Sequence, residues 1–166
     1  MADEQVIDAV TMAGLSERLD VTPMALYRHV ANKADLLDGV VELLLTESAP
    51  PPSELPWQER LAALAANMRT SARRHPSVFP LLLQHPATTV EARRTREAVY
   101  VALVEAGVPE DRTAQVERLV STAILGFVIS EVAGRFRNHT RRQLNADFEV
   151  LQTLLATFIH GADQGR

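Results

Sequence analysis

The 166-residue chain contains no cysteine. It therefore cannot form a disulfide framework, a thiolate metal site or a cysteine nucleophile. The five histidines are scattered, and no spacing typical of metal ligands occurs among them. No nucleophile stands beside a general base in a recognisable motif. The sequence thus argues against an enzyme, and neither a metal nor a cofactor is expected.

Signals for export or membrane insertion are also missing. The first residues, Met1–Gln5, lack the basic and apolar regions of a signal peptide. The longest apolar run, Leu119–Ile129, contains Ser121 and Thr122 and is too short to cross a bilayer. Apolar residues make up 46% of the chain, which is enough to build a core. The sequence therefore predicts a soluble cytoplasmic protein.

Positive charge is scarce. The net charge is -4 at pH 7, so no overall positive field attracts nucleic acid. In the first 46 residues, three cationic side chains stand against eight carboxylates, a net charge of -5 for this segment. Attraction to DNA through counterion release would be weak there. The charge therefore counts against a nucleic-acid partner.

What the chain does contain is helical periodicity. No segment alternates like a strand, and no internal repeat is found. The stretch 49–56 holds four prolines, which cannot continue a helix. The sequence therefore predicts an all-α protein with a head at 1–48, a linker at 49–56 and a helical domain at 57–166. Helices are expected at 12–19, 23–30, 33–47, 57–75, 78–84, 89–105, 112–136 and 143–159.

The most specific pattern lies at 20–33. Pro23 falls at the first position of a short helix, where its missing N–H and fixed φ are suitable. Leu26 and Val30 are four residues apart and can share a buried face. Three side chains are expected to act as N-caps in this part of the chain: Thr11, Thr22 and Asn32. A helix, a short turn and a second helix have the spacing of a helix-turn-helix motif.

A leucine-rich helix, Val21 in the turn, a Leu-Tyr-x-His-Val segment at 26–30 and an Asn-Lys-x-x-Leu-Leu start at 32–37 make a combined signature. This signature resembles the TetR family of one-component transcriptional repressors. The rest of the chain is similar to the family's tetracycline-repressor-type regulatory domain, at Trp57, Arg60-Leu61, His75-Pro76, Leu81-Leu82-Leu83, Ala106-Gly107 and Gly126-Phe127. The resemblance implies a helix-turn-helix head and a C-terminal helical bundle for regulation and dimerisation. It also implies three partners: an operator in double-stranded DNA, a small-molecule effector and a second copy of the chain.

The resemblance places the N-terminal part of the helix at 23–30 in the major groove. Apolar Met24 and Ala25 would then suit a thymine methyl group rather than hydrogen-bonded readout. Tyr27, His29 and Lys33 match positions that contact phosphates. The implied DNA-binding residues are Thr22, Pro23, Met24, Ala25, Tyr27, Arg28, His29 and Lys33. The residues alone leave alternatives: Tyr27 wedged between helices, His29 packed at a helix end, and Lys33 on an ordinary surface.

The resemblance further implies a pocket whose occupant changes the spacing of two reading heads. The candidate lining residues are Trp57, Met68, Phe79, Leu82, His85, Tyr100 and Phe127. Plain core packing is the alternative for each, because an aromatic or Met side chain on a helix is usually a core residue. His85 could orient an acceptor group on a ligand or lie on the surface. The identity of the effector cannot be read from these residues.

The last two long helices have broad apolar faces and several small residues that let another helix approach. They form either an ordinary internal core or a two-fold, four-helix dimer interface. In the second case the predicted interface residues are Val120, Ile124, Phe127, Leu151, Leu155 and Phe158. Two basic clusters, at 69–75 and 135–142, are interpreted as solvated faces. Neither has the series of interleaved aromatic residues expected for binding single-stranded nucleic acid.

Two positions depart from the family pattern. A longer first helix normally precedes the segment near Val6, where this sequence supplies only Met1–Gln5. The position matching Ala13 often holds an arginine or another donor. We therefore expect either a truncated chain or a protein that has lost part of its DNA-binding equipment. The leading hypothesis is a ligand-responsive homodimeric repressor of a palindromic operator; the alternative is a TetR-like protein that binds a small molecule or a partner but no longer DNA.

Overall fold

A computed structural model describes residues 10–48, 50–84 and 89–162. Every regular element in these ranges is a helix, which confirms the predicted all-α class. The helices are α2 (Met12–Arg18), α3 (Pro23–Tyr27), α4 (Lys33–Glu47), α5 (Trp57–Arg74), α6 (Leu81–Gln84), α7 (Val90–Glu105), α8 (Glu110–Val132) and α9 (Arg141–Ala162). None of the described helices combines the length and the hydropathy needed to span a membrane.

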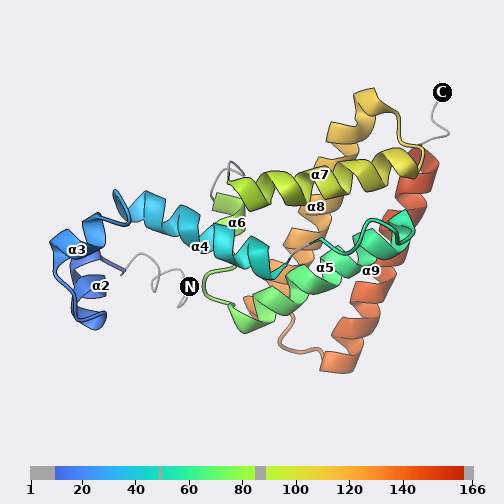
Figure 1. Ribbon diagram of the computed structural model, residues 1–166. Coiled ribbons are helices and arrows are strands. Elements are labelled where there is room, and N and C mark those ends of the chain that lie inside the picture. The colour runs from blue at the N-terminus through green and yellow to red at the C-terminus, as the bar shows by residue number, and fades with distance from the viewer. Residues whose placement is uncertain (1–9, 49, 85–88, 163–166) are drawn as a thin grey trace.

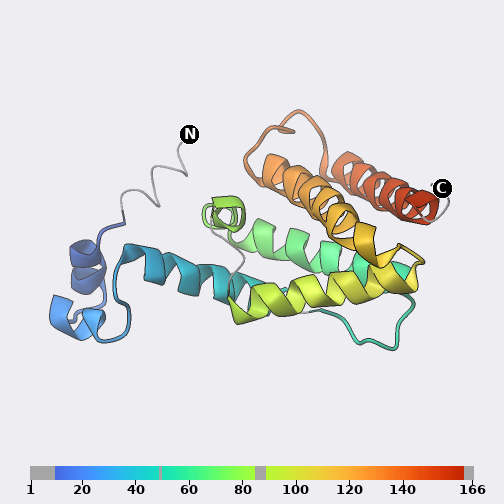
Figure 2. The same ribbon diagram turned by 90° about the horizontal axis from the view of Figure 1, so that it is seen from above.

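Helices α2 and α3 lie at one end of the molecule, and α4 runs from them to the bundle of α5 to α9 (Figure 1; Figure 2). All three predicted N-caps are confirmed. The side chains of Thr11, Thr22 and Asn32 each accept a hydrogen bond from the backbone N–H three residues later. In the turn between α2 and α3, Asp20 has a left-handed backbone with φ 54°, which aspartate tolerates better than most residues.

Helix α3 is shorter than the predicted 23–30. It ends at Tyr27, and the next two amides bond to carbonyls only three residues back, as in a tight turn. The chain must then become extended at Asn32, which has φ -165° and caps α4. The requirement for this second cap leaves no room for another helical turn.

Other helix boundaries differ from the predicted ones, and single residues explain the differences. Helix α6 starts at Leu81 rather than 78, because Pro80 has no N–H and disfavours the helical conformation before it. Helix α8 ends at Val132 rather than 136, where Gly134 (φ 74°) and the amide of Arg135 complete a Schellman motif. Helix α9 begins at 141 rather than 143, because Thr140 and Gln143 form a reciprocal capping box.

The core consists of three apolar clusters between the long helices. Ala72 on α5 and Ala102 on α7 have no exposed surface, and they lie in two different clusters of the core. Met68 on α5 contacts all three clusters. A flexible methionine is suited to such a junction, since it fills irregular gaps.

A buried ion cluster joins α5, α8 and α9. Arg69 donates to both carboxylate oxygens of Glu131 at 2.7 and 2.9 Å and to the carbonyl oxygen of Leu144 at 2.9 Å. Its guanidinium also lies 4.5 Å from the ring centroid of Phe148. Arg73 donates to Glu131 at 2.6 Å. The interpretation of 69–75 as a solvated face was therefore wrong for Arg69, which is buried.

This environment determines the ionisation of Glu131. Burial alone raises the pKa of its carboxyl group. Hydrogen bonds from Arg69 and Arg73, together with the positive charges of both side chains, lower the pKa by more, so it lies below the ordinary value of 4.5. Glu131 is consequently an anion held between two cations.

Helix α4 is attached to the bundle by packing and by polar contacts. Val41 and Leu45 pack against Leu81 of α6 and Ala92 of α7. The carboxylate of Glu42 accepts from the backbone N–H of Glu91 at 3.1 and 3.2 Å, which supplies an acceptor to the first turn of α7. At the C-terminal end of α4, the carboxylate of Glu47 pairs with the imidazole of His75 at 3.1 Å.

Candidate functional site

The first candidate site is the outer surface of α3 and its flanks. Met24 is 76% exposed and Tyr27 49% exposed. Six of the eight predicted DNA-binding residues are exposed there: Thr22, Pro23, Met24, Tyr27, Arg28 and His29. Ala25 and Lys33 are half-buried. The hydroxyl of Thr22 accepts from the amide of Ala25 at 3.2 Å, so it starts the helix. On this surface Met24 supplies an apolar tip, Tyr27 a phenol and Arg28 a guanidinium. These groups suit contacts to methyl groups and phosphates.

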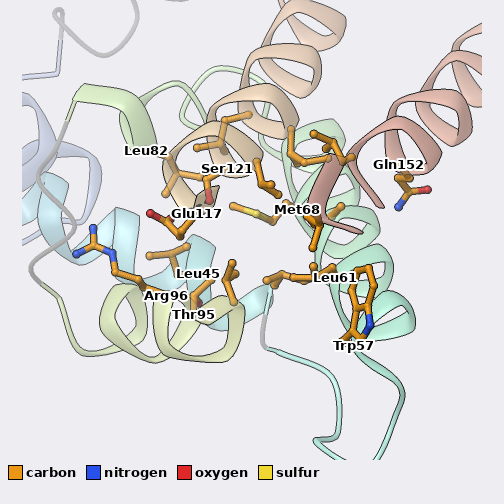
Figure 3. A pocket seen from close by; sticks show the side chains of 18 of the residues that line it. Leu45, Trp57, Leu61, Met68, Leu82, Thr95, Arg96, Glu117, Ser121 and Gln152 are labelled. Carbon is orange, nitrogen blue, oxygen red and sulfur yellow. Dashed lines mark hydrogen bonds between the residues drawn. The ribbon is translucent and has the colours of Figure 1, made fainter. Parts of the chain in front are cut away.

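The second candidate site is a cavity of about 230 Å³ inside the bundle (Figure 3). All helices from α4 to α9 contribute to its wall. Three predicted pocket residues line it: Trp57, Met68 and Leu82. The other apolar lining residues are Val41, Leu45, Leu61, Leu64, Ala65, Ala92, Val99, Val120, Ile124, Leu125, Leu155, Ala156 and Ile159. A largely apolar cavity with a few polar groups is the usual form of a small-molecule site.

The remaining predicted pocket residues lie elsewhere. Phe79 has no exposed surface and packs in the core cluster with Ala72 and Val128. The ring of Phe127 packs at a tilt against the rings of Phe136 and Phe148, with centroids 5.5 Å away in each case. Tyr100 is half-buried on α7 and does not line the cavity. His85 lies outside the described residues.

The cavity also has polar residues that the sequence reasoning missed: Gln58, Thr95, Arg96, Glu117, Ser121 and Gln152. Ser121 donates to Glu117 at 2.9 Å, and the amide nitrogen of Gln152 donates to the carbonyl oxygen of Ala62 at 3.0 Å. The hydroxyl of Thr95 is buried without a hydrogen-bond partner. A carboxylate and a hydroxyl four residues apart on an otherwise apolar helix face are the signal that could have found this side of the cavity.

The predicted dimer-interface residues are divided between core and surface. Val120 and Ile124 are buried in the subunit and line the cavity, as does half-buried Leu155. Phe127 and Leu151 are half-buried, and Phe158 is 43% exposed. The apolar residues most exposed on α8 and α9 are different ones: Leu119, Val150 and Leu154, at 52%, 57% and 61%. Sequence periodicity does not single them out, because in a helix that is apolar on most sides it does not distinguish the inner from the outer face.

Small residues accompany these exposed apolar side chains. A Cβ atom added to Gly126 on α8 or to Gly161 on α9 would meet no atom within 4 Å. The two helices therefore present an open, shallow surface rather than one already filled by the subunit. Across the described residues, no group of three or more His, Asp or Glu side chains could hold a metal ion.

Comparison with known proteins gives these sites a context. The family model described as "Tetracyclin repressor-like, C-terminal domain" matches residues 49–163. An HTH-type transcriptional regulator of Saccharopolyspora erythraea is 27% identical over 139 residues, covering 83% of this chain and 59% of that protein. The class A tetracycline repressor from transposon 1721 of Escherichia coli is 29% identical, covering 81% and 63%. The chain thus spans about 60% of the length of these two relatives.

Solved structures agree with this placement. BioQ of Mycobacterium smegmatis superposes with a TM-score of 0.81 at 25% identity, covering 96% of this chain and 91% of BioQ. A structure of BioQ with its double-stranded DNA operator gives a TM-score of 0.69 at 27% identity, with 93% and 94% covered. A TetR variant of Acinetobacter baumannii in complex with minocycline gives 0.77 at 26% identity, with 96% and 87% covered. The chain therefore belongs to the TetR family of transcriptional regulators.

Proposed function

We propose that this chain is a homodimeric, ligand-responsive repressor that binds a palindromic operator through α3. It acts in the cytoplasm without catalysing a reaction. The division into a head at 1–48, a linker at 49–56 and a regulatory domain at 57–166 is part of the proposal. Relatives of the family have been solved with an operator and with a small molecule, which supports both kinds of partner.

One observation carries this proposal: α4 reaches both candidate sites. Helix α4 begins directly after its cap Asn32, which follows the exposed residues of α3 and its flank by a few positions. Its second half supplies Val41 and Leu45 to the wall of the cavity. A molecule that enters the cavity therefore contacts the same helix that supports the reading surface. Such a shared rigid element is what allows one binding event to bias another.

A second copy of the chain is proposed to cover the exposed face of α8 and α9. Leu119, Val150, Leu154 and Phe158 leave apolar surface in water on two neighbouring helices, and Gly126 and Gly161 leave room for close approach. A two-fold contact between such helix pairs buries the same patch on both subunits. The dimer would present two α3 helices to half-sites one helical turn apart, about 34–36 Å.

The alternative function is ligand or partner binding without DNA binding. The net charge of -5 over the first 46 residues favours it, because few cations are available for phosphates. Binding of the purified protein to the DNA upstream of its own gene, measured at low and at moderate salt, separates the two functions. A complex that forms on this DNA but not on scrambled DNA supports the repressor; no sequence-selective complex at either salt concentration refutes it.

Arg28 gives a sharper test of the reading surface. Replacing Arg28 with alanine should weaken operator binding by about 1–3 kcal/mol, since an exposed guanidinium beside α3 is lost. Fluorescence anisotropy at several salt concentrations would measure the loss and its salt dependence. Arg94→Ala is the matched control, because its side chain is 64% exposed on α7, away from α3. Equal losses in the two variants would show that only overall charge matters.

Leu154 tests the proposed dimer face. Leu154→Arg should convert the dimer to a monomer, because a charge would be placed at the centre of a buried apolar contact. Sedimentation velocity measures the result without DNA or ligand. Val104→Arg is the control, since Val104 is an exposed apolar residue on α7 at 46%. A dimer that persists in Leu154→Arg would place the interface on another surface.

A further inference from the structure

The charged groups of the cavity lie on one side of it. Glu117 and Ser121 are on that side in Figure 3, with Arg96 below them, whereas Trp57 and the uncharged Gln152 lie on the opposite side. The amide nitrogen of Gln152 already donates to the carbonyl oxygen of Ala62. Between these two sides the wall is formed mainly by aliphatic side chains. A molecule that fills this space would need one polar end and an apolar body.

The carboxylate of Glu117 is incompletely satisfied. One of its oxygens accepts from the hydroxyl of Ser121 at 2.9 Å, and no other described residue donates to the group. The side chain is half-buried on a helix that is otherwise apolar toward the cavity. A ligand that covers this half-buried carboxylate removes it from water, which is costly unless the ligand brings a donor or a cation to it. The open side of Glu117 is therefore a position for a donor carried by a ligand.

Thr95 supplies a second unpaired group. Its hydroxyl is buried and lines the cavity from α7, yet it has no hydrogen-bond partner. Most buried hydroxyl groups in proteins have a partner, so an orphan that faces a cavity points to a molecule in that cavity. A hydroxyl can donate or accept, and it does not select a charge.

The remaining charge at the cavity is less suited to anchor a ligand. Arg96 is exposed and forms no hydrogen bond or ion pair with a described residue. An exposed guanidinium is screened by water and gains little from an added partner. An anionic ligand in the cavity would also face Glu117, at the cost of like-charge repulsion. The half-buried carboxylate therefore decides which charge is accepted.

Cavity size sets the scale of the ligand. A cavity of about 150 Å³ holds a benzene molecule. The present cavity of about 230 Å³ is therefore suited to one aromatic ring with a short chain. Trp57 at the far side offers aromatic surface to the apolar end.

We propose that the effector is a small lipophilic amine, with its ammonium group at Glu117 and its apolar body between Met68 and Trp57. This inference rests on the proposed function of the cavity as the effector site. Ser121 holds Glu117 in place, and the Thr95 hydroxyl bonds to a second polar atom where the ligand has one.

Three probes of one carbon skeleton test the proposal: phenylpropylamine, phenylpropanol and phenylpropionic acid. Their binding to the full chain can be followed by fluorescence, because Trp57 is the single tryptophan and lines the cavity. We expect the amine to bind about tenfold more tightly than the alcohol, as a charge-assisted hydrogen bond does relative to a neutral one, and the acid to bind most weakly.

Variants assign the preference to a residue. Glu117→Gln keeps an acceptor for Ser121 but removes the charge, so it should abolish the preference for the amine and leave alcohol binding within about twofold. Glu97→Gln is the matched control, because it removes the same charge at an exposed position of α7 that does not line the cavity, and it should leave the order of the three probes unchanged. Equal affinities, tightest binding of the acid, or no binding of the amine would each overturn the proposal. Operator binding measured on the same preparation without probes tests the proposed function separately.

Discussion

Replacing Arg69 with alanine should lower the free energy of unfolding by about 3 kcal/mol, which is the lower end of the cost of breaking a buried ion pair. The variant loses two hydrogen bonds to Glu131, one to the carbonyl oxygen of Leu144, and the contact with the ring of Phe148. Arg73 still pairs with Glu131, so the carboxylate is not left alone. Urea denaturation at a fixed protomer concentration measures the loss, since dimerisation would add to the apparent stability.

Arg74→Ala is the control for this result. Arg74 is exposed on the same helix, and its loss should change stability by no more than about 0.5 kcal/mol. Acid titration adds a second test. Because the pKa of Glu131 in the folded protein lies below 4.5, its stabilising effect is complete above that value and is lost as the pH falls through the folded-state pKa. Arg69→Ala should lose less stability than the wild type over this acid range; parallel losses would contradict the assignment.

Truncating Phe79 to alanine should cost about 3–5 kcal/mol, the usual range for a buried phenylalanine. Phe79 has no exposed surface, although it lies in the turn between α5 and α6 rather than in a helix. Its ring packs in the cluster that includes Ala72, Ile124 and Val128, so its removal would leave a cavity between α5 and α8. The midpoint of urea unfolding is the measurement.

Leu83→Ala is the matched control for Phe79. Leu83 lies four residues further along and is 58% exposed, so its truncation should be nearly neutral. Similar losses in the two variants would mean that the segment contributes through its local conformation and not through the buried ring. A neutral Phe79→Ala would contradict the packing described for the Phe79 ring between α5 and α8.

Much of the fold could be predicted because the relevant signals are local. Caps such as Thr11, Thr22 and Asn32 act within one turn, and the proline-rich stretch stops a helix by covalent geometry. The predicted helix boundaries were wrong where two local signals compete. Helix α8 continues the apolar pattern past Val132, but the left-handed Gly134 ends it.

The site was less predictable because it depends on which side of each helix faces inward. Trp57, Met68 and Leu82 line the cavity as expected, yet Phe79 and Phe127 fill other parts of the core. Arg69 shows the same difficulty for charges. An arginine in a basic run looks solvated until its partner, 62 residues later in the sequence, is known. Tertiary pairing of this kind leaves no trace in periodicity.

The carboxylate of Glu42 has an energetic consequence for the way the two ends of the molecule communicate. It is the acceptor for the amide of Glu91 at the start of α7, although it belongs to α4, the helix that follows α3. Moving α4 relative to α7 would leave that amide to water, at a cost of about 1.4 kcal/mol, comparable to the loss of one helix cap. A free-energy gap of this size is equivalent to about a tenfold change in an equilibrium constant. This contact therefore gives α4 a defined energetic link to α7, and Glu42→Gln would weaken that link without changing a residue that lines the cavity.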